Sequence, residues 1–261
     1  MKQAGSSRRR GTRGAAGDWR HRLLVHHLPT ALASAAAVVV LVGLPPFTHR
    51  SIFTGAFSLS LFTIATGYVA TVLLALTLLI GPANLLLGRR NPVSSYLRRD
   101  LGTWTAIYSV IHVIVGFQVR GDGGAFGFVD FFVANGRPLV DSFGLGNWTG
   151  LAALVIVAGL LALSTNRSLR ELKAERWKNL QRLNYTLFAL VVLHAVFYGA
   201  LARPASPFTL LLLATVLAVL GGQAVGIWLH RRSRHARTPR PTARAAADRP
   251  RRIRISHRTP E

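Results

Sequence analysis

Six long apolar segments, separated by clusters of arginine, constrain the fold of this 261-residue chain more than any other feature. Each segment is long enough to cross about 30 Å of hydrocarbon at roughly 1.5 Å per residue. Half of the residues are hydrophobic, yet the formal net charge is +23, a combination that ordinary soluble domains do not show. The sequence therefore predicts an all-α integral membrane bundle of six transmembrane helices, at residues 29–46, 61–80, 101–118, 147–164, 183–201 and 208–229.

The positive charges are distributed unequally between the two sides of these segments. Of the 32 Lys and Arg residues, 28 lie in the two termini and in the 81–100 and 165–182 loops. Loops on the cytoplasmic side of membrane proteins carry the excess of Lys and Arg. We therefore expect both termini to be cytoplasmic. We also expect the first segment to be retained as a helix, because no small-residue cleavage site follows it.

The two ends of the chain differ in composition from the apolar part. Residues 1–28 and 231–261 are rich in Arg and Ala and lack the apolar residues that a core requires. They are predicted to be a basic disordered cytoplasmic arm and a basic disordered cytoplasmic tail around a six-helix domain at 29–230. The longest external segment, 119–146, holds several Phe among glycines and carboxylates, and we expect it to lie in the outer interface. It is either a passive loop or a segment that covers a site or receives a partner.

Two of the nine histidines, His112 and His194, lie inside the predicted membrane core. Ionisable side chains at that depth are costly and are candidates for function. Each lies 11 residues into its helix, counted from Leu101 and from Leu183. Both helices run outward, so the two imidazoles are predicted at one depth, about 16 Å from the inner boundary.

The residue types around this pair restrict what it can bind. The chain has no Cys, its single Met is Met1, and no carboxylate lies at this depth, so zinc or copper would lack further ligands. A porphyrin brings four nitrogens of its own and needs only axial ligands from the protein. The pair therefore favours one haem b that transfers electrons. Two alternatives remain open without haem: a helix-packing contact in a membrane scaffold, or a proton relay in a transporter.

Short motifs in a fixed order resemble ferric-reductase-like transmembrane domains. They are the run from Arg98 to Trp104 that leads to His112, Thr66-Gly67 followed by the run from Leu79 to Pro82, and the run from Trp177 to Leu180 that leads to His194. In layout the chain is most similar to the haem-binding membrane subunits of bacterial methionine sulfoxide reductase systems. The resemblance implies an oxidoreductase component of the bacterial cytoplasmic membrane, with His112 and His194 as axial iron ligands. It would carry electrons from a cytoplasmic or membrane donor to an external acceptor.

The chain departs from that family in its inner half. The places where relatives carry inner-leaflet histidines hold Arg98, Arg99 and Gln181. We therefore expect one haem, in the outer half of the bilayer. A quinone or flavin at the cytoplasmic side would then bridge the inner half, near Trp177, Lys178 and Arg182.

Two further expectations concern charges and partners. Arg120 and Arg203 are the external cations nearest to the histidines in sequence, and we expect them to bind haem propionates. No Gly-rich phosphate loop or strand pattern follows the sixth segment. We therefore expect a separate electron donor, either a flavoprotein reductase or a quinol, an external acceptor or partner protein, and no nucleic acid.

Overall fold

The computed structural model describes residues 21–43, 58–89, 96–120, 127–165, 168, 171 and 173–237. This part of the chain is mostly helical, and six of its helices are long and apolar enough to cross a membrane. The predicted helical membrane bundle is therefore confirmed. The six candidate spans are Leu23–Gly43, Leu59–Leu86, Tyr96–Val119, Ser142–Leu163, Glu175–Phe197 and Pro207–Arg232.

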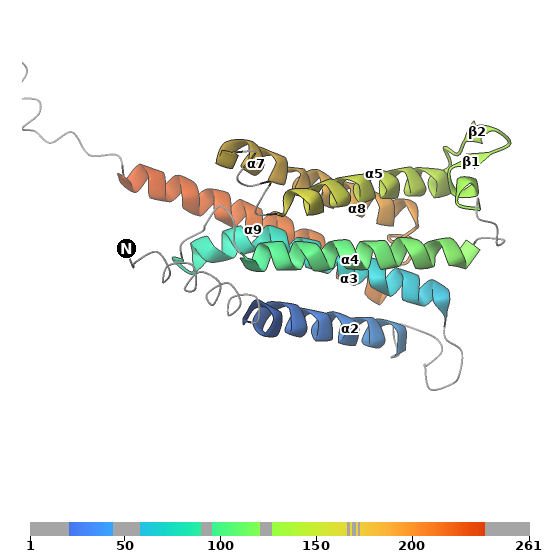
Figure 1. Ribbon diagram of the computed structural model, residues 1–261, viewed down its shortest axis with the longest axis horizontal. Coiled ribbons are helices and arrows are strands. Elements are labelled where there is room, and N and C mark those ends of the chain that lie inside the picture. Colours follow the sequence, from blue (N-terminus) through green and yellow to red (C-terminus); the bar gives the residue numbers. More distant parts are fainter. Residues whose placement is uncertain are drawn as a thin grey trace, which may run out of the picture.

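The helices pack around a central one, α3, which is the most buried of the six spans. Helix α3 packs along α4, α9 and α2, and α5 packs along α8 (Figure 1). The short α7 lies at one end of the bundle and a β-hairpin at the other; we call these the α7 end and the hairpin end (Figure 1). The helices are α2 (Leu28–Gly43), α3 (Leu59–Leu86), α4 (Tyr96–Arg120), α5 (Ser142–Leu163), α7 (Lys173–Gln181), α8 (Leu183–Phe197) and α9 (Pro207–Arg237).

The hairpin belongs to the segment that was expected to lie in the outer interface. A 3-10 turn, η3 (Val129–Phe131), leads into the antiparallel strands β1 (Val133–Ala134) and β2 (Arg137–Pro138). The two residues between the strands, Asn135 and Gly136, both have positive φ, 52° and 72°. Asn-Gly is the preferred sequence for such a tight hairpin turn, because both positions must be left-handed.

Threonine hydroxyls inside the spans are satisfied by their own helices. Thr66 donates to the carbonyl of Phe62 at 2.9 Å, and Thr105 donates to the carbonyl of Leu101 at 3.0 Å. In a bilayer each polar group must find its partner within the protein. Bonds to the preceding turn allow these residues to lie in apolar spans.

Helix α3 contains a proline, Pro82, which cannot donate to the carbonyl of Leu78 one turn earlier. Gln223 of α9 supplies the missing donor, because its Nε2 lies 2.8 Å from the Leu78 oxygen. The Gln223 Oε1 in turn accepts from the hydroxyl of Tyr185 at 3.1 Å. One glutamine thus joins α3, α8 and α9 near the α7 end.

Two glycines let α9 approach α3 at this level. A Cβ on Gly222 would clash with the Leu79 side chain, and a Cβ on Gly226 would lie 3.3 Å from Cγ of Pro82. Small residues at such a spacing are the usual means of close helix packing in membranes.

The helical part extends past both limits of the predicted 29–230 domain. A five-residue π-helix, η1 (Leu23–His27), runs directly into α2, and α9 continues to Arg237. Residues 21–28 are therefore helical and not a disordered arm, which corrects that boundary. The rest of the predicted arm and tail lies outside the described residues.

Helical structure before residue 28 is explained by a charge cluster on Asp100, a residue of α4 that is 2% exposed. Arg22 forms an ion pair with its carboxylate, His26 Nδ1 lies 2.7 Å from Oδ2, and His27 Nε2 lies 3.4 Å from Oδ1. The Arg22 guanidinium also lies 4.6 Å from the centre of the Tyr96 ring. A buried carboxylate is costly unless it is paired, so these contacts hold the start of the first span against α4.

Removing this carboxylate should loosen the first span. We expect Asp100→Asn to lower the free energy of unfolding by about 2 kcal/mol, because hydrogen bonds to charged groups are lost. Thermal unfolding in detergent measures this, and proteolysis near residue 22 should become faster. Asp130→Asn, at an exposed carboxylate of η3, is the control and should leave both unchanged. Equal stability of the two variants would contradict the assigned role.

Candidate functional site

His112 of α4 and His194 of α8 lie side by side in the bundle. Their ring centres are 5.9 Å apart and the ring planes are nearly perpendicular, at 83°. The equal offsets in the two helices anticipated that these residues would meet. The fold thus brings together the two histidines that the sequence placed in the membrane core.

Each imidazole is anchored on the backbone of a neighbouring helix. His112 Nδ1 lies 2.8 Å from the carbonyl oxygen of Thr63 on α3. His194 Nδ1 lies 2.7 Å from the carbonyl oxygen of Gly146 on α5. A carbonyl only accepts, so each Nδ1 donates, and in the neutral imidazole each Nε2 then keeps its lone pair. This arrangement is typical of histidines that ligate a metal through the other nitrogen.

A glycine one turn after each carbonyl makes room for the ring. A Cβ on Gly67 would lie 2.9 Å from His112 Nδ1, and a Cβ on Gly150 would lie 2.8 Å from His194 Nδ1. Both values are too short for a real Cβ contact, so the two imidazoles occupy space that any other residue would fill. The requirement for glycine at these positions comes from packing against the rings.

The two anchors repeat one local pattern that the sequence analysis missed. Helix α3 supports the histidine of α4, and α5 supports the histidine of α8. In each support helix the glycine follows a threonine, as Thr66-Gly67 and as Thr149-Gly150. The repeated dipeptide was the available signal, but a two-residue repeat carries no weight until the fold places both copies against a histidine.

Tyr198 and Asn147 extend the site toward the hairpin end, and the sequence analysis did not single them out as site residues. The Tyr198 ring centre lies 4.9 Å from that of His194, and its hydroxyl donates to Asn147 Oδ1 at 2.5 Å. The Asn147 side chain is buried, and its Nδ2 donates to the carbonyl of Phe131 at 2.8 Å. Asn147 therefore links the hairpin segment to the residue beside His194.

The two arginines expected at this site lie at the hairpin end. Arg203 is exposed in the turn between α8 and α9, where its carbonyl accepts from Thr209 Oγ1 at 2.8 Å. Arg120 is the last residue of α4, and its side chain lies outside the described part of the protein. Within the described residues, no contact joins Arg203 to the histidine pair.

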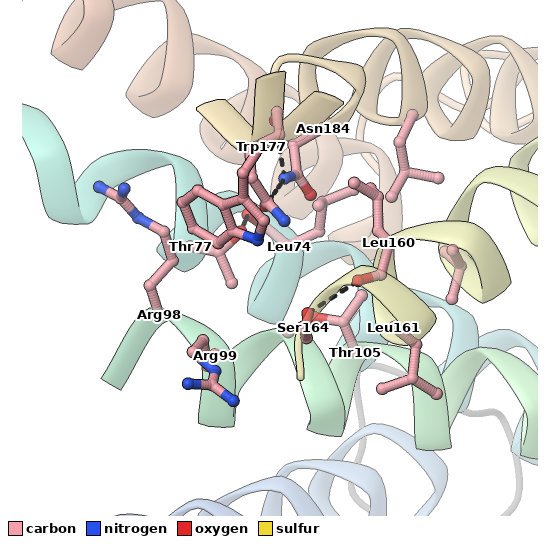
Figure 2. Close-up of a pocket in the computed structure, with 14 residues that line it drawn as sticks. Leu74, Thr77, Arg98, Arg99, Thr105, Leu160, Leu161, Ser164, Trp177 and Asn184 are labelled. Atoms are coloured by element: carbon pink, nitrogen blue, oxygen red, sulfur yellow. Dashed lines mark hydrogen bonds between the residues drawn. The ribbon is translucent and has the colours of Figure 1, made fainter. Parts of the chain in front are cut away.

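A partly open cavity lies nearer the α7 end (Figure 2). Trp177 is buried at its wall, donating its indole N–H to the carbonyl of Leu163 at 3.1 Å. None of the described residues that line it is a histidine. Of the residues expected at a cytoplasmic donor site, Trp177 lines the cavity, Arg182 is exposed outside it, and the Lys178 side chain is not described. The polar and charged lining residues are Thr77, Arg98, Arg99, Thr105, Ser164, Gln181 and Asn184.

Comparison with known proteins agrees with this geometry. Residues 66–192 match the family described as ferric reductase like transmembrane component. The protein-methionine-sulfoxide reductase heme-binding subunit MsrQ of Ralstonia nicotianae is 32% identical over 212 residues, which are 79% of this chain and 91% of the relative. The chain belongs to this ferric-reductase-like family. This member is therefore a multi-pass membrane protein and a membrane electron-transfer component.

Further relatives of this ferric-reductase-like protein carry the same MsrQ name. The one from Deinococcus radiodurans is 34% identical over 156 residues, which are 60% of this chain and 69% of the relative. The one from Bordetella pertussis is 32% identical over 174 residues, which are 65% of this chain and 76% of the relative. No solved structure matches the chain.

The glycine supports can be tested without any ligand. Gly67→Ala and Gly150→Ala should each displace an imidazole and lower the free energy of unfolding by about 1–3 kcal/mol, the usual cost of overpacking. Gly159→Ala is the matched control, because a Cβ at this position on α5 meets nothing within 4 Å. Thermal unfolding in detergent compares the three. Equal stability of Gly150→Ala and Gly159→Ala would disprove the packing argument.

Proposed function

We propose that this protein holds one haem b between His112 and His194 and transfers electrons across the bacterial cytoplasmic membrane. The observation that carries the proposal is the paired imidazoles, each with its Nδ1 on a backbone carbonyl. A metal–imidazole bond is about 2 Å long, so two imidazoles that held one iron between them would have ring centres roughly 6 Å apart. The observed separation of 5.9 Å fits this requirement.

The chain's own residues would do three things for such a group. The carbonyls of Thr63 and Gly146 keep the protons on Nδ1, which would leave both Nε2 lone pairs available to the iron. Gly67 and Gly150 hold the rings in one orientation. A haem held by both imidazoles would supply a one-electron couple. The name of the relatives, heme-binding subunits, supports this assignment.

The direction of transfer follows from the charges of the loops. The described parts of the two arginine-rich loops lie at the α7 end, which we assign to the cytoplasm together with both termini. Electrons would then enter at the α7 end and leave at the hairpin end, where we propose that Arg120 and Arg203 pair with haem propionates. Since the relatives are named as subunits of a reductase, we assign the external acceptor to a partner protein.

The cavity at the α7 end is the proposed entry point. Its lining offers amide and guanidinium donors beside an indole ring, which suits a flat donor with carbonyl oxygens such as a quinol or a reduced flavin. A second haem would need axial ligands, and the described lining residues include no histidine. Asn184 is fixed there by donating to Gln181 Oε1 at 3.1 Å.

The haem assignment predicts a six-coordinate b-type spectrum in purified protein, with one haem per chain. We expect His112→Ala and His194→Ala each to abolish it in the dithionite-reduced minus oxidised spectrum, because each removes an axial ligand. His21→Ala, at an exposed histidine outside the pair, should keep the full signal. Haem-free protein from haem-replete cells would overturn the proposal and favour a transporter or scaffold.

The donor cavity predicts a defect in electron entry alone. We expect Asn184→Leu to slow the reduction of the haem by about tenfold, with either a soluble quinol or reduced flavin mononucleotide as the reductant. A reductant that can no longer form a hydrogen bond with residue 184 would bind in the wrong position. Stopped-flow absorbance measures the rate of haem reduction. The reductant whose rate falls is the one that binds in the cavity. Arg182→Gln is the control, because this exposed side chain lies outside the cavity. Unchanged rates with both donors would refute this placement.

A further inference from the structure

A continuous set of aromatic rings runs from His194 toward the hairpin end of the bundle. Tyr198 lies against His194, and each further ring contacts the next one toward the hairpin segment. The centre-to-centre distances are 5.9 Å for Tyr198–Phe143, 5.7 Å for Phe143–Phe131, 5.0 Å for Phe131–Phe117 and 6.5 Å for Phe117–Phe128. Phe143, Phe131 and Phe117 belong to α5, η3 and α4, whereas Tyr198 directly follows α8 and Phe128 directly precedes η3, so four parts of the chain converge on one small region.

Phe131 is the centre of this set. Its side chain is 8% exposed, whereas Phe128 and Tyr198 at the edges are 49% and 50% exposed. Its main chain is also fixed, because the Phe131 carbonyl accepts from Asn147, which accepts in turn from the Tyr198 hydroxyl. The hairpin segment therefore places one phenyl ring among the others and holds it there through a buried amide.

An apolar layer at this place has two physical effects on a redox site. Bringing a hydrated ion into such a layer costs the ion its water, and nothing in the ring cluster replaces it. Excluding water also changes the dielectric around the iron and hence its reduction potential. Both the exclusion of ions and the change in reduction potential should depend more on the central ring, Phe131, than on the exposed rings of Phe128 and Tyr198.

The geometry points to Phe131 as a plug that closes the hairpin end of the site to water and to small hydrated oxidants. This inference rests on the proposed haem site. Small dissolved ferric complexes would then be slow acceptors, in agreement with the proposed partner protein. The plug is thus a determinant of acceptor specificity, separate from the residues that hold the haem.

The test uses ferricyanide, a small anionic oxidant that takes one electron from the ferrous protein and gives ferrocyanide and the ferric protein. We expect Phe131→Ala to raise the reoxidation rate constant by about tenfold, because the shell that limits solvent access is opened. The haem midpoint potential should fall, since water stabilises the more highly charged ferric state. Phe132→Ala is the matched control, because this neighbouring ring packs on Trp148 outside the set. Phe131→Val, which keeps more of the packing, should give an intermediate rate.

A second measurement does not need haem. The chain has no cysteine, so His194→Cys introduces a unique thiol at the site. A charged thiol reagent should label haem-free His194→Cys slowly, and about tenfold faster when Phe131→Ala is added. Adding Phe132→Ala should leave the labelling slow. Equal labelling with and without Phe131→Ala would overturn the plug, whereas a wild type without haem would overturn only the proposed function.

Discussion

The hydrogen bonds from His112 and His194 to main-chain carbonyls determine how the centre of this protein is built. An imidazole in an apolar bundle needs a partner, and a helix interior offers carbonyls that are already bonded within their own turn. Reaching such a carbonyl requires the ring to lie against the helix surface. Gly67 and Gly150 provide that surface. The positions of α3 beside α4 and of α5 beside α8 follow from this requirement.

In both helix pairs a histidine bonds to a main-chain carbonyl of the neighbouring helix. The remaining elements pack against these two pairs. The η1 segment that leads into α2 is fastened to α4 through the ion cluster on Asp100, close to the arginines that line the cavity at the α7 end. At the other end, Asn147 fastens the hairpin segment to Tyr198. The histidine pair therefore lies between a polar cavity and an apolar cover. This asymmetry agrees with the proposal that electrons enter by one route and leave by another.

Much of this arrangement was predictable, because hydropathy and charge are one-dimensional properties. Six spans and the pairing of His112 with His194 followed from segment length and from equal offsets along two helices. Contacts between helices were not predictable in the same way. Asn147 and Phe131 are 16 residues apart, and nothing in the sequence indicates that the Asn147 side chain donates to the Phe131 carbonyl. The helical start of the first span was missed because its stability comes from Asp100, far along the chain.

The bond between Gln223 and the Leu78 carbonyl has a consequence for biogenesis. The two residues are 145 positions apart, and membrane helices are inserted in the order of their synthesis. Helix α3 therefore enters the bilayer with an oxygen that Pro82 has left without its helical donor. That oxygen receives its glutamine only when the sixth span arrives. In a chain that terminates before α9, the Leu78 carbonyl would lack its glutamine donor. This unsatisfied carbonyl would distinguish incomplete chains from complete ones.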